Sequence, residues 1–171
     1  MYQVGDVVCY GSTGVCEVIE VGPRKLKGAD PQRIYYTLRP LYGSETIYTP
    51  VDTRVFIRSA LSCREAEALI DRIPSIEERI CTERSLTMLR EHYEHCLQSH
   101  ACEELVQLIK GIWRKNRTAE ENGKKPGQMD LRYQKRAEDL LHGELAVALG
   151  IKREEVVSYI TCRVEQLNEA K

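Results

Sequence analysis

The amino-acid sequence predicts an α+β protein in which a small, strongly bent β-sheet precedes an all-α helical bundle. Up to residue 60, short apolar runs are separated by glycine, proline and aspartate, a pattern typical of tightly turned strands. Beyond Ser59 the apolar residues recur with the helical period, and serine-led capping patterns precede the first helical segments. The two patterns divide the 171 residues into a domain of residues 1–60 and a domain of residues 61–171.

Short strands are expected throughout the N-terminal domain. Glycine or proline ends each apolar run, as at Gly11 and Gly14 after the first strand and at Pro50 after the fourth. Five short strands in fewer than 60 residues are too few for a β-sandwich. They favour a small barrel-like sheet of the SH3 or Tudor kind. The expected strands are Val7–Tyr10, Val15–Val21, Arg33–Arg39, Glu45–Thr49 and Arg54–Ile57.

Helices are expected from Ser62 onward. Ser62 and Glu65 form a capping box for the first helix, which Pro74 ends, and a second capping pattern at Ser75 predicts a short helical turn. Gly150 is expected to end a later helix as its C-cap. A polar, broken stretch over residues 116–128 reads as a loop. The expected helices span residues 62–73, 83–97, 103–115, 129–149 and 152–167.

Composition indicates a soluble, reduced, cytoplasmic protein. The chain is 42% hydrophobic and has a net charge of −1, and no run of about 18 apolar residues occurs, so no membrane partner is expected. The N-terminus lacks a basic region followed by an apolar core, which argues against a secretory signal. Seven scattered cysteines without a Cys-x-x-Cys pair favour free thiols over a disulfide framework.

No catalytic or cofactor motif is visible, so we expect a non-enzymatic protein without a cofactor. The sequence contains no P-loop, no Gly-x-Ser-x-Gly and no His-Glu-x-x-His. One group resembles metal ligands, but a zinc site needs paired ligands that converge, and no second pair occurs. No metal site is therefore expected, and a metal-sensing domain is kept as the least supported alternative. The group consists of His92, His95, Cys96, His100 and Cys102.

Three fragments in order give the chain a resemblance to a known family. They are Val4-Gly5-Asp6-x-Val8-x-Tyr10 followed by Gly14, then Leu26-Lys27-Gly28 with Tyr35-Tyr36, then the helical pair at residues 105–114 and 135–146. Their order and spacing resemble those of the CarD family of bacterial transcription regulators along nearly the whole chain. The resemblance implies a barrel that binds the β subunit of RNA polymerase by sheet augmentation. It also implies a helical module that contacts promoter DNA at the upstream edge of the transcription bubble.

The resemblance assigns polymerase-binding residues unevenly. Arg24 lies where the family has a basic residue that contacts polymerase, and Lys25 and Lys27 lie in the same turn. Tyr48 occupies another contact position, which is often basic in the family, so an ion pair would be absent while the ring can still pack. A merely solvated basic turn is the alternative for the three cations.

The DNA-binding assignment departs further from the family. The family commonly has a tryptophan at the start of the helix that corresponds to residues 83–97, where an apolar side chain wedges at a base step. Here Leu86 stands at that place, with Arg79, Arg84 and Arg90 as substitute phosphate contacts. The alternative is that Leu86 and Met88 pack in the core.

Basic residues also gather between Lys110 and Arg136, where nine cations face three acids. From this span we select Arg114, Lys115 and Arg132 as DNA-binding candidates, with contacts to backbone and DNA shape and little sequence specificity. The alternative is a solvated helix end, since cations complement the dipole there. Trp113, beside a full apolar stripe, is expected to be a packing anchor.

Two functions follow from these observations. The first is a CarD-like regulator that binds polymerase and promoter DNA and alters the stability of the open complex. The second is a polymerase-docked adaptor whose helical domain binds a protein in place of DNA, which the near-neutral charge and the altered wedge favour. The sequence assigns neither an oligomeric state nor a direction of regulation.

Overall fold

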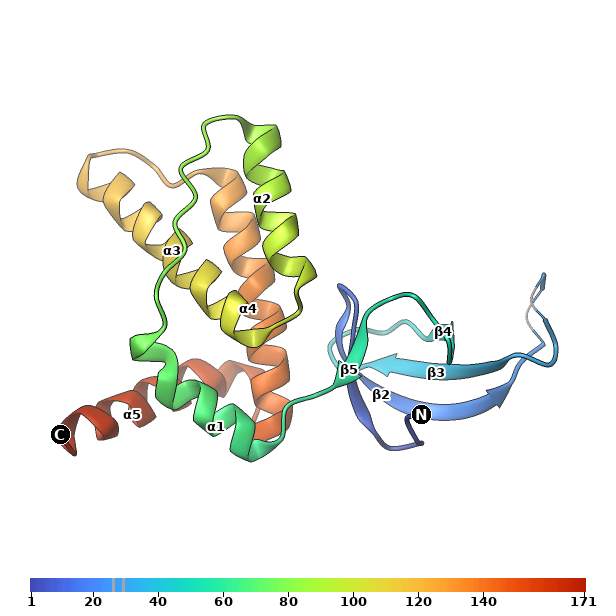
Figure 1. Ribbon diagram of the computed structural model, residues 1–171. Coiled ribbons are helices and arrows are strands. Elements are labelled where there is room, and N and C mark those ends of the chain that lie inside the picture. Colours follow the sequence, from blue (N-terminus) through green and yellow to red (C-terminus); the bar gives the residue numbers. More distant parts are fainter. Residues whose placement is uncertain (26, 29) are drawn as a thin grey trace. The chain divides into compact units, whose positions relative to one another are not determined.

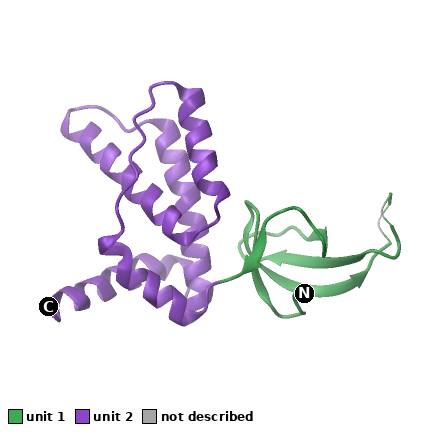
Figure 2. Ribbon diagram, in the orientation of Figure 1, with its two compact units in different colours: residues 1–60 green, residues 61–171 purple. Residues whose placement is uncertain are grey.

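The computed structural model describes residues 1–25, 27, 28 and 30–171, so Leu26 of the Leu26-Lys27-Gly28 match lies outside the described residues. Five strands are followed by helices (Figure 1), which confirms the α+β fold. The chain divides into two compact units, residues 1–60 and residues 61–171 (Figure 2). Among the described residues, no helix is both long and apolar enough to cross a membrane.

The first unit is an antiparallel sheet with the strand order β4-β3-β2-β1-β5. Four expected strands are confirmed, with ends shifted by at most two residues, but the last strand begins at Ile57 and not at Arg54. The preceding residues form turns, in which Thr53 N donates to Pro50 O and Val55 N donates to Thr53 Oγ1. The strands are β1 (Val7–Tyr10), β2 (Gly14–Pro23), β3 (Ile34–Pro40), β4 (Ile47–Pro50) and β5 (Ile57–Ser59).

A β-bulge in β2 decides which side chains face the core of the sheet. Val18 pairs with Leu38, but the next registered pair is Glu20 with Thr37, so Ile19 is an extra residue on β2. Val18 and Leu38 are fully buried in the core. Strict alternation would place Glu20 on the same face as Val18, and the bulge turns it to the opposite face instead.

The second unit consists of five α-helices and two short 3₁₀ turns. The predicted caps are confirmed at two ends: Ser62 and Glu65 form the capping box of the first helix, and Gly150 ends the fourth in the left-handed conformation at φ 67°. The helices are α1 (Cys63–Arg72), α2 (Leu86–Gln98), α3 (Cys102–Glu121), α4 (Gln128–Leu149) and α5 (Val156–Glu169), with 3₁₀ turns at Ile73–Ser75 and Arg153–Glu155.

The first half of the loop expected at residues 116–128 is helical, so that prediction was wrong there. The helix α3 continues to Glu121 because Asn116 is buried and its amide donates to Gln134 Oε1 at 3.1 Å. The polar character of this stretch therefore comes from a buried hydrogen bond and an exposed helical face. Only the segment that follows Glu121 connects α3 to α4.

The prediction of a helical turn at Ser75 was also wrong, because residues 76–85 form an extended segment, which is called the strap below. Arg79 N donates to Gln107 O of α3 at 3.1 Å, which anchors the strap across that helix. A Cβ on Gly111 would lie only 1.9 Å from Arg79 O, so glycine permits this close approach. Ile76 and Cys81 are buried in the helical core, and that burial outweighs a local capping pattern.

Candidate functional site

The face of the sheet opposite its core carries an ordered row of side chains. Glu20 pairs with Thr37, and Thr37 pairs with Tyr48, so the three residues form one cross-strand row over β2, β3 and β4. Directly paired residues of an antiparallel sheet present their side chains on the same face. The middle residue, Thr37, is only 2% exposed, whereas Tyr48 is 42% exposed.

Arg24 explains why the middle of this row is covered. Its guanidinium forms an ion pair with the carboxylate of Glu20 and lies 4.5 Å from the centre of the Tyr48 ring. Because it contacts both ends of the row, Arg24 crosses above Thr37. Arg24 Nε and Thr37 Oγ1 are buried and have no hydrogen-bond partner within the described part of the chain.

The structure therefore brings together two predicted polymerase-binding residues, Arg24 and Tyr48, in one stacked pair. Lys25 and Lys27 are exposed, and neither makes a hydrogen bond or an ion pair with another described residue. Tyr48 lies on β4, which is an edge strand of the sheet. Cation–π stacking at a partly exposed site contributes about 0.5–1 kcal/mol, enough to orient the ring and the guanidinium.

In the helical unit, the N-terminal ends of α2 and α4 border a concavity of about 450 Å³. Leu86 and Arg132, two predicted DNA-binding residues, both line it, together with Leu89 and Met129. Leu86 is 68% exposed and Met88 is 52% exposed, so the alternative that these two residues pack in the core was wrong. Leu86 is the first residue of α2, directly after the N-cap Ser85.

The predicted DNA-binding cations of the helical unit are in two different states. Arg84, Arg90 and Arg132 are exposed, and none makes a hydrogen bond or an ion pair with a residue that the structure describes. Arg114 and Lys115, by contrast, already have intramolecular partners. Arg114 pairs with Glu78 of the strap at 2.7 Å, and Lys115 pairs with the buried Asp130 at 3.0 Å.

The same division applies to the rest of the basic span from Lys110 to Arg136. Lys124 and Lys125, in the connection between α3 and α4, are exposed and make no ion pair with described residues. The charge count of the sequence could not separate these two cations from their paired neighbours. The paired neighbours are Lys110 with backbone carbonyls, Arg117 with Glu121, Lys135 with Asp139 and Arg136 with Glu94.

A polar network joins α2 to α4, and one of its members, Asp130, lines the concavity. Tyr93 donates a hydrogen bond to Asp130 at 2.5 Å. Burial of the Tyr93 hydroxyl raises its pKa, and the hydrogen bond to Asp130 raises it further. Tyr133 donates to Glu94 at 2.6 Å, and this bond, with the nearby charge of Arg136, lowers the pKa of Glu94. The network fixes the relative positions of the two helix ends that carry Leu86 and Arg132.

The histidine and cysteine cluster does not converge. His92 Nε2 lies 3.7 Å from Cys96 Sγ on one face of α2, whereas Cys102 Sγ lies 3.1 Å from Glu144. Burial and the charge of Arg79 lower the pKa of His92. Within the described ranges, no three such side chains are placed to hold a metal ion.

Trp113 was expected to be a packing anchor, and that prediction was wrong. Its side chain is 54% exposed, and the guanidinium of Arg117 lies 5.6 Å from the ring centre. The neighbouring positions explain this, because Gly111 faces the strap and Ile112 faces the core. The helix α3 therefore turns Trp113 outward.

Comparison with known proteins adds one finding. Residues 2–59 match the family described as the CarD-like/TRCF RID domain. The match covers almost the whole first unit and none of the helical unit. No curated protein matches the chain.

Proposed function

We propose that the chain uses its CarD-like/TRCF RNA polymerase-interacting domain, residues 2–59, to dock on the polymerase β subunit. We propose further that its helical unit contacts promoter DNA beside the transcription bubble. The edge strand β4 offers main-chain hydrogen-bonding groups to a partner strand. Arg24 and Tyr48, stacked beside that edge, would provide selectivity for the β subunit. Lys25 and Lys27 would add electrostatic attraction.

One observation carries the DNA contact: an exposed leucine at a helix N-terminus borders a concavity that is also lined by Arg132, a cation without an ion pair among the described residues. Leu86 would wedge at a base step of a distorted duplex, and unstacking costs a few kcal/mol that the new contacts offset. Arg84, Arg90 and Arg132 would contact phosphates, joined by Lys124 and Lys125 from the adjoining loop.

The proposed effect on transcription is a change in the lifetime of the open complex. A protein that binds the open state more tightly than the closed state shifts the equilibrium only by that difference in affinity. The proposal requires no catalytic step, no cofactor and no metal. It places the protein in the bacterial cytoplasm, where polymerase works.

A polymerase-docked adaptor is the second candidate, and the state of Arg114 and Lys115 favours it. Both cations are held by acidic side chains, which reduces the charge available for phosphates. The helical unit would then bind a protein, with the barrel unchanged in its role. DNA association separates the two candidates.

We would test the DNA contact by measuring the affinity of the full chain for a labelled promoter fragment with a premelted bubble, over a series of salt concentrations. The logarithm of the association constant should fall linearly with the logarithm of salt, and each lost phosphate contact should reduce the slope by about 0.9. Arg84→Gln and Lys124→Gln should each reduce it, whereas the matched control Arg114→Gln should leave it unchanged. A slope near zero, with polymerase binding retained, would contradict the DNA contact and favour the adaptor.

A further inference from the structure

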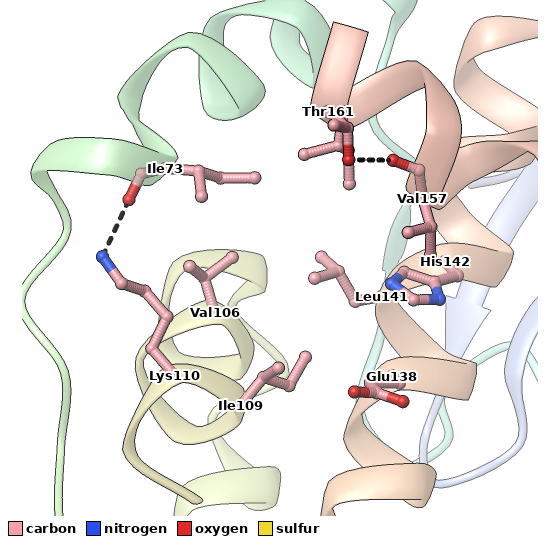
Figure 3. Close-up of a pocket in the computed structure, with 10 residues that line it drawn as sticks. Ile73, Val106, Ile109, Lys110, Glu138, Leu141, His142, Val157 and Thr161 are labelled. Atoms are coloured by element: carbon pink, nitrogen blue, oxygen red, sulfur yellow. Dashed lines mark hydrogen bonds between the residues drawn. The ribbon is translucent and has the colours of Figure 1, made fainter. Parts of the chain in front are cut away.

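The helical unit contains a second hollow that the proposed function does not use. It has a volume of about 240 Å³ and lies between α3, α4, α5 and the 3₁₀ turn after α1. Figure 3 shows the side chains of Ile73, Val106 and Leu141 directed at one common space. The apolar lining consists of Ile73, Val106, Ile109, Leu141, Val157 and Ile160.

The polar groups at its rim differ in what they still can bind. The ammonium of Lys110 is bonded to two backbone carbonyls, those of Ile73 and Ile76, so its hydrogen-bonding capacity is largely taken. The hydroxyl of Thr161 donates to Val157 O at 3.0 Å, as Figure 3 shows. The Thr161 hydroxyl proton is thus used within α5, and Lys110 keeps one of its three ammonium protons.

Glu138 and His142 lie one helical turn apart on α4, and both line the hollow. Glu138 Oε1 accepts from Gln134 Nε2 at 3.1 Å, and no cation of the described chain forms an ion pair with this carboxylate. Burial lowers the pKa of His142, so its imidazole is neutral near pH 7 and keeps one acceptor nitrogen. The α4 side of the rim therefore presents two hydrogen-bond acceptors beside the apolar lining.

We propose that this pocket binds a small amphiphilic amine, with an apolar ring or short chain inside and a protonated amine at Glu138. A carboxylate without a cationic partner attracts an ammonium group, and a charge-assisted hydrogen bond between them is about twice as strong as a neutral one. A carboxylic acid of the same shape is repelled by Glu138. The volume, small among ligand pockets, limits the occupant to about one ring with a two-carbon linker.

Phenethylamine is a suitable probe, and 2-phenylethanol and phenylacetate are its matched neutral and anionic analogues. Titration of the ¹⁵N-labelled full chain should shift the amide signals of the lining residues, with a dissociation constant on the order of 1 mM for the amine. The amine should bind at least about tenfold more tightly than phenylacetate, a difference of about 1.4 kcal/mol. Shifts that never saturate, or that lie outside the lining, would overturn the proposal.

Two variants separate the carboxylate from the apolar lining. Glu138→Gln should abolish the preference for the amine over the alcohol, whereas Glu165→Gln, an exposed carboxylate on α5, should leave it intact. Val157→Phe, at a half-exposed wall position, should block all three probes while the amide spectrum remains that of the folded chain. An unchanged amine preference in Glu138→Gln would contradict the proposed role of that carboxylate.

Discussion

Arg24 links two of the predicted polymerase-binding positions at the scale of single residues. Its guanidinium is shared between the Glu20 carboxylate and the Tyr48 ring, and its side chain remains 30% exposed. A partner that contacts Tyr48 therefore also meets a guanidinium that is already held in place by its ion pair with Glu20. The position of Arg24 in a motif predicts a contact, and the stack explains why that contact is ordered in advance.

Replacing Arg24 with alanine should weaken binding to the polymerase β subunit about tenfold, because both the charge and the support of the Tyr48 ring are lost. Biolayer interferometry with the immobilised subunit measures this change. Arg33→Ala is the matched control, since Arg33 is an exposed arginine of the same unit that pairs with Asp52 at 2.9 Å. Equal losses in the two variants would show that Arg24 has no specific role.

Thr37→Val should raise the free energy of unfolding by about 1 kcal/mol. The Thr37 hydroxyl is buried beneath Arg24 without a hydrogen-bond partner in the described part of the chain, and valine has nearly the same shape. Urea denaturation of the full chain, followed by the sheet signal, measures the change. A loss of stability would mean that the hydroxyl has a partner, such as an ordered water molecule.

Sequence reasoning located Arg24 and Tyr48 but could not place them together. Their contact depends on the bulge at Ile19, which turns Glu20 outward, and no local pattern in the β2 sequence marks that extra residue. Likewise Arg114 and Lys115 look like free cations in a basic span, yet their acidic partners come from the strap and from α4. Charge patterns reveal which groups exist, and tertiary contacts decide which of them remain free.

At the scale of elements, the strap determines where α2 begins. The strap crosses α3 at Gly111, and its residues Ile76 and Cys81 are buried in the helical core. Ser85 then caps the helix that starts at Leu86. The sequence predicted a short helical turn at Ser75, because a capping pattern occurs there, and a separate helix from residue 83. The turn does not form, because the strap residues are buried and because Gly111 of α3 admits the strap backbone, and both causes are non-local.

Gly111→Ala should destabilise the helical unit by about 3 kcal/mol or more, because the new methyl group would meet backbone and not a movable side chain. Thermal unfolding, monitored by the circular dichroism of the helices, measures this loss of stability. Gly22→Ala is the steric control, since a Cβ there has nothing within 4 Å. A small effect at Gly111 would show that the strap can move away from α3, and it would remove the account of how Leu86 is positioned.

At the scale of the whole molecule, the two units carry different kinds of information. The first has a recognisable family pattern over residues 2–59, so both its fold and its class of partner could be predicted. The periodicity and the capping patterns largely predicted the fold of the second unit. They did not predict which of its side chains are exposed, and only the structure shows this. Trp113 shows why, since a tryptophan beside an apolar stripe points outward once its neighbours are assigned to the strap and the core.

The most direct test of the central claim is the lifetime of the open complex formed by bacterial polymerase on a promoter fragment, measured with the full chain, with Leu86→Ala and with Val157→Ala. Leu86 and Val157 are exposed apolar residues of the same unit, at 68% and 56% exposure. We predict that the full chain and Val157→Ala change the lifetime equally. Leu86→Ala should lose most of that effect while it still binds polymerase. A lifetime that responds equally to all three proteins would contradict the proposed DNA contact.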